Sequence, residues 1–299
     1  MKFLHRYMRA IGFSTLDSRS KIQELLTETV MHSNRRDIAR NGDNVLIGEF
    51  CKDFAKGVGI AVCGEFDEDE KFIYEYYYPY LEGSGITSNE DVSVERHADK
   101  ESYAGVCDEI KVGITLIFYL KNKIPYIKAQ TANKLPVVGT TLTLSALSVS
   151  GTVMFPIQKD AEQMQRVKQA SATRNNLMAA ARKGDEDAIE TLTLEDMDMY
   201  TTISRRIQNE DIFSLVDTYF MPYGVECDQY SVMGEILGMR LVTNQVTEEK
   251  VYILTICSNE LIFDVSINKE DLFGEPKVGR RFRGVIWLQG QINYPEAEL

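Results

Sequence analysis

The densest collection of side chains able to carry out chemistry lies between residues 95 and 109. This stretch holds His97, Cys107, Asp108 and Glu109, and such residue types serve in acid–base and thiol catalysis. A catalytic thiol needs a base beside it, and neither the spacing of His97 and Cys107 nor the residues around the cysteine match a nucleophile signature. We therefore interpret the stretch as a charged loop between strands, and keep an enzyme centred on it as an alternative.

A second candidate is one face of a strand predicted over residues 280–292. Successive side chains of a strand point to opposite sides, so the apolar residues fall on one face and Arg281, Arg283, Trp287 and Gln289 on the other. Such a face could stack and clamp single-stranded nucleic acid. We favour an intramolecular or protein interface, because the chain beyond residue 210 carries 7 basic and 14 acidic residues and repels phosphates.

Tyrosines at alternate positions predict a further surface. Tyr74, Tyr76, Tyr78 and Tyr80 share one side of a predicted strand, and aromatic rings with a polar tip are favoured at binding surfaces. We include Tyr76 and Tyr78, with the arginine and tryptophan face, in one candidate ligand or partner surface. The simpler interpretation is that these rings pack under a helix with their hydroxyl groups at the rim.

Common catalytic and cofactor motifs are not found in the sequence. The glycine-rich stretch 57–64 runs along a predicted strand and opens no helix, and Gly139-Thr140-Thr141 lacks the lysine of a phosphate-binding loop. The five cysteines form no CxxC pair and the three histidines are far apart, which favours reduced thiols over disulfides or a zinc site. We expect no cofactor, no metal and no catalytic residue, and we lean towards a protein that is not an enzyme.

The charge balance restricts the partners. The chain has 299 residues and a net charge of −12, which repels phosphate backbones and anionic membranes. Charged residues interrupt Met1–Arg9, so we expect no secretory signal, and the most apolar stretches are too short or too polar to span a bilayer. We predict a cytoplasmic protein whose partner is another protein or a second copy, with nucleic acid disfavoured and no membrane contact.

Hydrophobic periodicity divides the chain into a helical start, a β-rich first half, a helical middle and a β-rich end. Residues 1–40 predict helix with Ser18 or Ser20 as the N-cap. The stretch beyond Val45 predicts strands, including a hairpin with an acidic turn at residues 67–70. Further strands are predicted over residues 114–120 and 138–149.

The middle of the chain predicts three helices after Pro156. The first ends at Gly184, Asp185 caps a short second helix, and Thr193 begins the third in a capping box with Asp196. The strands predicted after them lie near residues 230–242, 250–258, 260–268 and 280–292, with a helical turn at 269–273.

These elements predict an α+β protein. We expect an N-terminal mixed β-sheet with helices at residues 1–155, a helical connector at 156–210, and a small C-terminal OB-like β-barrel or curved sheet at 211–299. The favoured function is a non-enzymatic binding or assembly protein with a protein partner. Single-stranded nucleic-acid binding through the OB-like domain and an enzyme centred on residues 95–109 are the alternatives.

Three segments of the chain resemble one protein family. They are Leu4–Ser14, Tyr76–Tyr80 and Gly284–Gly290, and they are similar to an uncharacterised domain-of-unknown-function family from clostridial bacteria. The likeness covers most of the chain. It implies a cytosolic bacterial protein and brings no catalytic residues with it.

Overall fold

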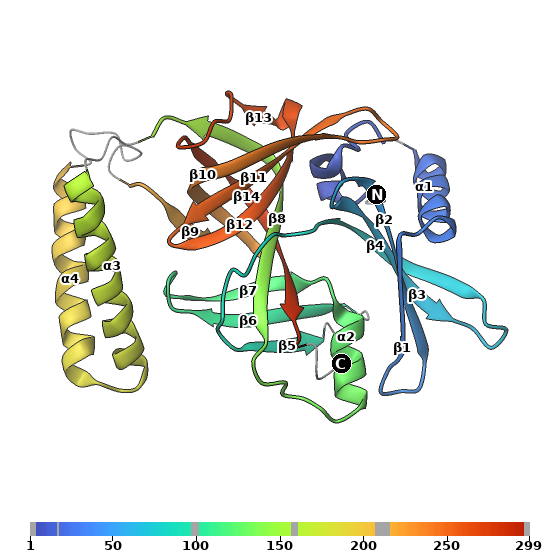
Figure 1. The fold of residues 1–299 in the computed structure, drawn as a ribbon, viewed down its shortest axis with the longest axis horizontal. Helices are drawn as coiled ribbons and strands as arrows, with labels where there is room; N and C mark the ends of the chain where they lie inside the picture. Colours follow the sequence, from blue (N-terminus) through green and yellow to red (C-terminus); the bar gives the residue numbers. More distant parts are fainter. Residues whose placement is uncertain (1–3, 17, 97–101, 157–160, 207–215, 296–299) are drawn as a thin grey trace.

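The computed structural model describes residues 4–16, 18–96, 102–156, 161–206 and 216–295 (Figure 1). The helical elements are η1 (Arg6–Ile11), α1 (Arg19–Met31), α2 (Lys123–Thr131), α3 (Ala161–Arg182), α4 (Glu186–Arg206) and η2 (Lys269–Asp271). The strands of the first half are β1 (Arg35–Arg40), β2 (Leu46–Ala55), β3 (Val58–Phe66), β4 (Phe72–Leu81), β5 (Val92–Arg96), β6 (Tyr103–Glu109), β7 (Ile114–Leu120) and β8 (Thr141–Met154). Those of the last third are β9 (Tyr219–Pro222), β10 (Gln229–Thr243), β11 (Lys250–Ser258), β12 (Leu261–Asn268), β13 (Leu272–Phe273) and β14 (Arg281–Asn293).

Strands β1 to β4 form an antiparallel sheet in chain order. The predicted acidic hairpin is confirmed between β3 and β4, where the carboxylate of Asp67 accepts hydrogen bonds from the backbone N–H groups of Asp69 and Lys71. Helix α1 begins as predicted at Ser18, whose side chain accepts from the N–H of Lys21. Its buried residues, among them Leu25, join the core beneath this sheet.

The second sheet closes into a five-stranded barrel, which confirms the α+β class and the barrel expected near the C-terminus. Strands β10, β11 and β12 form an antiparallel meander, β8 lies parallel to β12, and β14 joins β8 to β10. The barrel therefore takes β8 from residues 1–155 and its other four strands from 211–299. The division of the chain at 155 and 210 stays a prediction.

Strand β14 carries the sheet beyond the barrel. It pairs in parallel with β7 through Gln289 and Gly290, and β7 continues into β6 and β5. Strand β5 is the last of this row, and in the described part of the chain it pairs with β6 alone. One long side of β5 is therefore an open sheet edge.

Two hydrophobic cores lie on opposite faces of β14. The predicted apolar face is confirmed, since Phe282, Ile286 and Leu288 are buried in the core inside the barrel. The opposite face is also covered, because Trp287 lies in a second core shared with η1, α1 and the four-stranded sheet. Strand β14 therefore joins the barrel to the N-terminal part of the chain.

The prediction of helix over residues 35–40 was wrong. This segment is β1, an edge strand whose residues pair one by one with β2, from Arg35 opposite Cys51 to Arg40 opposite Leu46. Charged side chains suit a sheet edge, because they oppose pairing with other chains. The arginines of this segment therefore lie on an edge strand and not on a helix.

Two further expectations were also wrong. The capping box at Thr193 does not exist, because α4 is one helix whose start is capped by Asp185, and the Thr193 hydroxyl donates to the carbonyl of Ile189 within the helix. Residues 95–109 are not mainly a loop, since they belong largely to β5 and β6. Residues 97–101 lie outside the described part of the chain.

Helices α3 and α4 form a hairpin that projects from the sheets (Figure 1). Gly184 adopts a φ of +87° in the turn, a conformation that favours glycine. Arg174 of α3 contacts Asp196 of α4 at 2.7 Å, and Arg182 donates to the carbonyl of Asp108 in β6. None of the described helices combines the length and apolar character needed to cross a bilayer.

Phe118 of β7 packs between the barrel and its extension, so substitutions at and around its ring test this packing. Its ring covers Gly105 of β6 and Gly290 of β14, where an added Cβ would come within 2.2 and 2.3 Å of ring atoms. We expect Gly290→Ala to lower the free energy of unfolding by about 1–3 kcal/mol through overpacking. Phe118→Ala should lower it by about 3–5 kcal/mol through the cavity that it leaves.

Urea unfolding followed by the fluorescence of Trp287 measures both effects. Gly42→Ala is the matched control, because no atom lies within 4 Å of the added Cβ. A Gly290→Ala protein as stable as the Gly42→Ala protein would contradict this packing.

Candidate functional site

A polar pocket of about 400 Å³ lies between the four-stranded sheet and the junction of β7 with α2. We call it the Lys121 pocket. Its charged and hydroxyl-bearing lining residues are Arg35, Asp37, Glu49, Tyr78, Tyr80, Glu82, Lys121 and Tyr294. Ionisable groups with perturbed pKa values in a pocket of this size are features of functional sites.

Glu49 is the buried acid of this pocket, with 2% of its surface exposed. The hydroxyl of Tyr78 lies 3.1 Å from Glu49 Oε2 and 3.0 Å from the carbonyl oxygen of Lys121. A phenol has one proton and the carbonyl can only accept, so both bonds form when the Glu49 carboxyl is itself protonated. Burial raises the pKa of Glu49, while the charges of Lys123 and Arg35 oppose this shift. Both observations favour a neutral acid.

Lys121 follows β7 and is the buried base of the pocket, with 5% of its surface exposed. Its Nζ donates to the carbonyl of Leu81 and to Ser145 Oγ. Burial lowers the pKa of Lys121 to about 8, and the negative charge of Glu82 acts in the opposite direction. The amine is therefore partly neutral near physiological pH.

Arg35 lies at the mouth of the pocket, where its guanidinium is within ion-pair distance of three carboxylates. These are Asp37 at 3.1 Å, Glu82 at 3.4 Å and, at the longer distance of 3.9 Å, Glu49. The same guanidinium donates to Cys51 Sγ at 3.1 Å. Bidentate and networked arrangements of this kind hold an arginine in place. The entrance is thus lined by fixed charges of both signs.

Two cysteines lie close to the pocket, but their chemistry is suppressed. Cys51 and Cys63 are buried and contact the Glu49 carboxyl at 3.8 and 3.5 Å. Burial raises the pKa of Cys63 to about 12, so the thiol stays protonated and a poor nucleophile. Within the described ranges, no three His, Cys, Asp or Glu side chains are placed to hold a metal ion.

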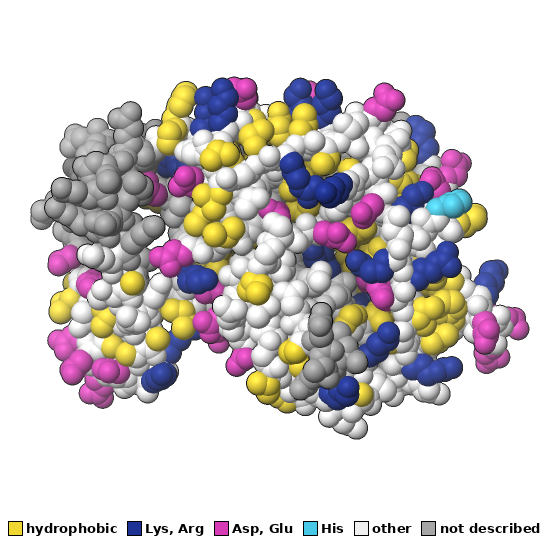
Figure 2. Space-filling view, viewed as in Figure 1, with side chains coloured by type: hydrophobic (Ala, Val, Ile, Leu, Met, Phe, Trp, Pro, Cys, Tyr) yellow, Lys and Arg dark blue, Asp and Glu magenta, His cyan; other side chains and the backbone are white. Residues whose placement is uncertain are grey.

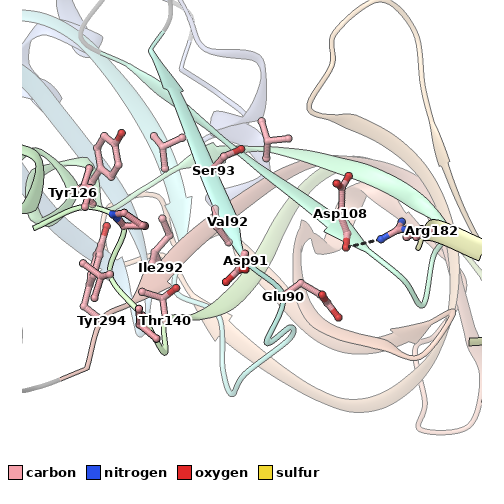
Figure 3. Close-up of a pocket in the computed structure, with 16 residues that line it drawn as sticks. Glu90, Asp91, Val92, Ser93, Asp108, Tyr126, Thr140, Arg182, Ile292 and Tyr294 are labelled. Carbon is pink, nitrogen blue, oxygen red and sulfur yellow. Dashed lines mark hydrogen bonds between the residues drawn. The ribbon is translucent and has the colours of Figure 1, made fainter. Parts of the chain in front are cut away.

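A second cavity, of about 830 Å³, opens along strand β5 (Figure 3). We call it the β5 cleft. Five successive residues, Glu90–Val94, line it, and because strand side chains alternate between faces, the backbone itself borders the cavity. Figure 3 shows Tyr126, Ile292 and Tyr294 at one end and Asp108 with Arg182 at the other.

The residues predicted as a ligand or partner surface are mostly interior. Tyr78, Arg281, Trp287 and Gln289 are buried and Tyr76 is partly buried, whereas Arg283 is exposed. In the described structure, therefore, only Arg283 of these six residues is exposed, and its Nε donates to the Tyr219 hydroxyl at 3.3 Å.

Trp287 shows why this surface is interior. Its ring stacks on Tyr7 at 5.3 Å, and its Nε1 donates to Asp228 at 2.6 Å. Gln289 donates to the carbonyl of Pro79 and accepts from the N–H of Leu81, which ties the barrel to β4. This face of β14 is an intramolecular interface formed with η1 and the four-stranded sheet, and not with the helical connector.

The acid–base candidates of residues 95–109 are divided between two faces of β6. Cys107 is buried in the barrel-side core and Asp108 lines the β5 cleft. Glu109 is buried, and its Oε2 has no hydrogen-bond partner among the described residues. His97 lies outside the described part of the chain. The described structure does not bring this set together in one cavity.

Sequence reasoning missed Glu49, Lys121 and Arg35, which come from three separate segments. One local signal was present: Glu49 falls inside the mostly apolar run 46–51 of β2, and a charge that is buried in such a run needs partners. Lys121 directly follows the apolar strand β7. These three residues come together because separate parts of the two sheets pack against each other. Hydrophobic periodicity does not predict how sheets pack.

Glu49→Gln tests the neutral acid, because glutamine has the shape of a protonated glutamate. A carboxyl whose pKa is raised on folding stabilises the protein below its ordinary value of 4.5, and this contribution is lost as the pH rises through the raised value. We therefore expect the free energy of unfolding of the wild type, relative to Glu49→Gln, to fall as the pH increases above about 4.5.

Urea titrations at several pH values between about 4 and 8 measure this difference. Glu68→Gln, in the exposed turn of the β3–β4 hairpin, is the control for the loss of a carboxyl group outside the pocket. A wild type that gains stability over Glu49→Gln as the pH rises would show that Glu49 is charged in the folded protein.

Comparison with known proteins gives one match. No curated protein and no solved structure matches the chain. A family model described as "Domain of unknown function, E. rectale Gene description" (DUF3881) matches residues 8–290 and confirms the resemblance of the three segments. Because the match covers nearly the whole chain, the protein belongs to the DUF3881 family.

Proposed function

We propose that this protein is a non-enzymatic binding protein that takes up an extended, basic segment of a partner protein along β5. The observation that carries the proposal is the open edge of β5, which borders the β5 cleft. A sheet edge presents a row of backbone N–H and C=O groups, and an extended peptide can pair with them as an added strand.

The walls of the β5 cleft support a peptide as the occupant. One side is apolar and aromatic, with Tyr126, Ile292 and Tyr294, and would receive alternate side chains of an added strand. A cavity of about 830 Å³ has room for several side chains.

The charge of the cleft selects a basic segment. Glu90, Asp91 and Asp108 are acidic lining residues, and Arg182 is the one basic residue among those that line the cavity. Complementary charge steers encounter and disfavours acidic partners. The same acidic lining, with the net charge of −12, disfavours a nucleic acid.

We further propose that the protein acts in the cytoplasm. Its five cysteines are free thiols, three of them buried, as is usual in a reducing compartment. An open strand edge could pair with unrelated proteins in the cytosol. The walls of the β5 cleft limit such pairing, so the open edge is compatible with a specific cytosolic protein partner.

A labelled peptide of alternating lysine and valine, about ten residues long, serves as the probe. We expect binding to weaken at least about fivefold in Glu90→Lys/Asp91→Lys, because exposed charge pairs contribute about 0.2–1 kcal/mol each and reversal adds repulsion. Fluorescence anisotropy measures the affinity. Hydrogen exchange should show new protection of the backbone amides of Val92–Arg96 when the peptide binds.

Glu68→Lys/Asp69→Lys is the matched control, since it makes the same charge change in the exposed β3–β4 turn. Equal weakening of peptide binding in both double variants would show that the effect comes from the net charge of the protein and not from the β5 cleft. Binding without protection of β5 amides would exclude strand addition.

The α3–α4 hairpin supports self-association as a second candidate. On α4, Met197 is 63% and Tyr200 is 76% exposed, and Ile189 and Leu194 are also exposed. Figure 2 shows acidic and apolar side chains gathered together near the free end of this hairpin. Apolar side chains exposed together on a projecting helix are features of protein interfaces.

We expect the wild type to form a dimer that Met197→Glu/Tyr200→Glu converts to monomer, because two apolar anchors are replaced by charges. Light scattering after size-exclusion chromatography measures the mass. Val138→Glu, at an exposed apolar residue outside the hairpin, is the control and should leave the dimer intact. A wild type that is monomeric at high concentration would eliminate this candidate.

A further inference from the structure

We propose that the Lys121 pocket binds a small aldehyde or ketone and that the Lys121 amine forms a reversible imine with it. This site shares Ile292 and Tyr294 with the β5 cleft but includes no residue of β5, and it goes beyond peptide binding. Three observations carry the inference: the hydrogen bonds of the amine, the place of Lys121 among the residues that line an open pocket, and the unpartnered hydroxyl of Tyr294, another lining residue.

The hydrogen bonds of Lys121 match a neutral amine. An ammonium group has three N–H donors, whereas Nζ has two acceptors, the carbonyl of Leu81 and Ser145 Oγ. Ser145 donates its own proton to the Leu81 carbonyl, so its oxygen accepts from the lysine. No carboxylate in the described part of the chain forms an ion pair with Nζ. A buried ammonium without a counter-ion is costly, whereas a neutral amine uses two protons and keeps a lone pair.

The Lys121 pocket offers room and a polar contact. Its volume of about 400 Å³ exceeds that needed by a molecule of a few heavy atoms. Tyr294 lines both this pocket and the β5 cleft, and its buried hydroxyl has no hydrogen-bond partner among the described residues. Buried polar groups in folded proteins are usually paired, so this hydroxyl fits a polar group of a ligand.

The chemistry balances without any redox partner. The nitrogen lone pair attacks the carbonyl carbon, a C–N bond forms, and the π electrons of the C=O bond move to oxygen. One proton passes from nitrogen to that oxygen to give a carbinolamine. A second proton then lets the oxygen leave as water, as the nitrogen lone pair forms the C=N bond and nitrogen loses its remaining proton. Amine and carbonyl thus give imine and water, with no net proton change.

Butanal with sodium cyanoborohydride traps the imine as a stable secondary amine, and peptide mass spectrometry reports labelling at each lysine. Lys56, which is exposed, is the internal reference. Burial lowers the pKa of Lys121 to about 8, against about 10.4 for a free lysine, so its neutral fraction at pH 7 is roughly 200-fold larger than that of a free lysine. We expect initial labelling of Lys121 at least about tenfold faster than that of Lys56, despite its burial.

The pH dependence distinguishes this site from surface reactivity. Labelling of Lys121 should level off above about pH 8, because most of the amine is neutral above its pKa. The charged and titratable groups that act on Lys121 are Glu82, Arg35, Asp264 and Cys51. Because Glu82 raises the pKa of Lys121, Glu82→Gln should move the profile to lower pH.

The wild-type measurement requires no variant and therefore does not depend on the folding of a mutant. Labelling of Lys121 at pH 7 no faster than that of Lys56 would overturn the proposal. A pH profile of Lys121 labelling that Glu82→Gln leaves unchanged would also count against the proposal. Glu82 is a suitable site for this variant, because it lies at the pocket mouth and half of its side chain is exposed.

Discussion

The burial of both faces of β14 is the constraint on which the rest of this structure depends. Its even-numbered residues fill the barrel, and Trp287 on the other side fills a core shared with η1 and the four-stranded sheet. The same strand pairs with β8 and β10 and passes on to β7. One segment thus fixes the barrel, the three-stranded extension and the N-terminal sheet relative to one another.

Buried polar groups lie at the interface between the barrel, its three-stranded extension and the N-terminal sheet. Gln289 bonds to the backbone of β4, Lys121 reaches back to the end of β4, and Glu49 contacts Tyr78. Each such group is costly to bury unless it is paired, so together they specify one arrangement of the two sheets. The Lys121 pocket lies at the same interface.

The local elements were largely predictable, whereas their assembly was not. Alternation placed Phe263 and Val265 inside a barrel and set the bounds of β7, since burial on one or both faces leaves a period that the sequence displays. The partner of β12 could not be foreseen, because β8 precedes the helical hairpin and no local pattern encodes non-local pairing. Trp287 was expected on a polar face for the same reason: its covering residue, Tyr7, is at the other end of the chain.

The pairing of β8 with β14 has a consequence for how the chain acquires its structure. Strand β8 is synthesised well before residues 281–293, and until these emerge, its bonding groups lack the neighbour that they have in the barrel. Pairings between distant segments form slowly, and exposed strands attract other chains in the meantime. The nascent protein therefore passes through a stage in which β8 lacks its partner β14, and its barrel is completed after the chain has grown past its final strand.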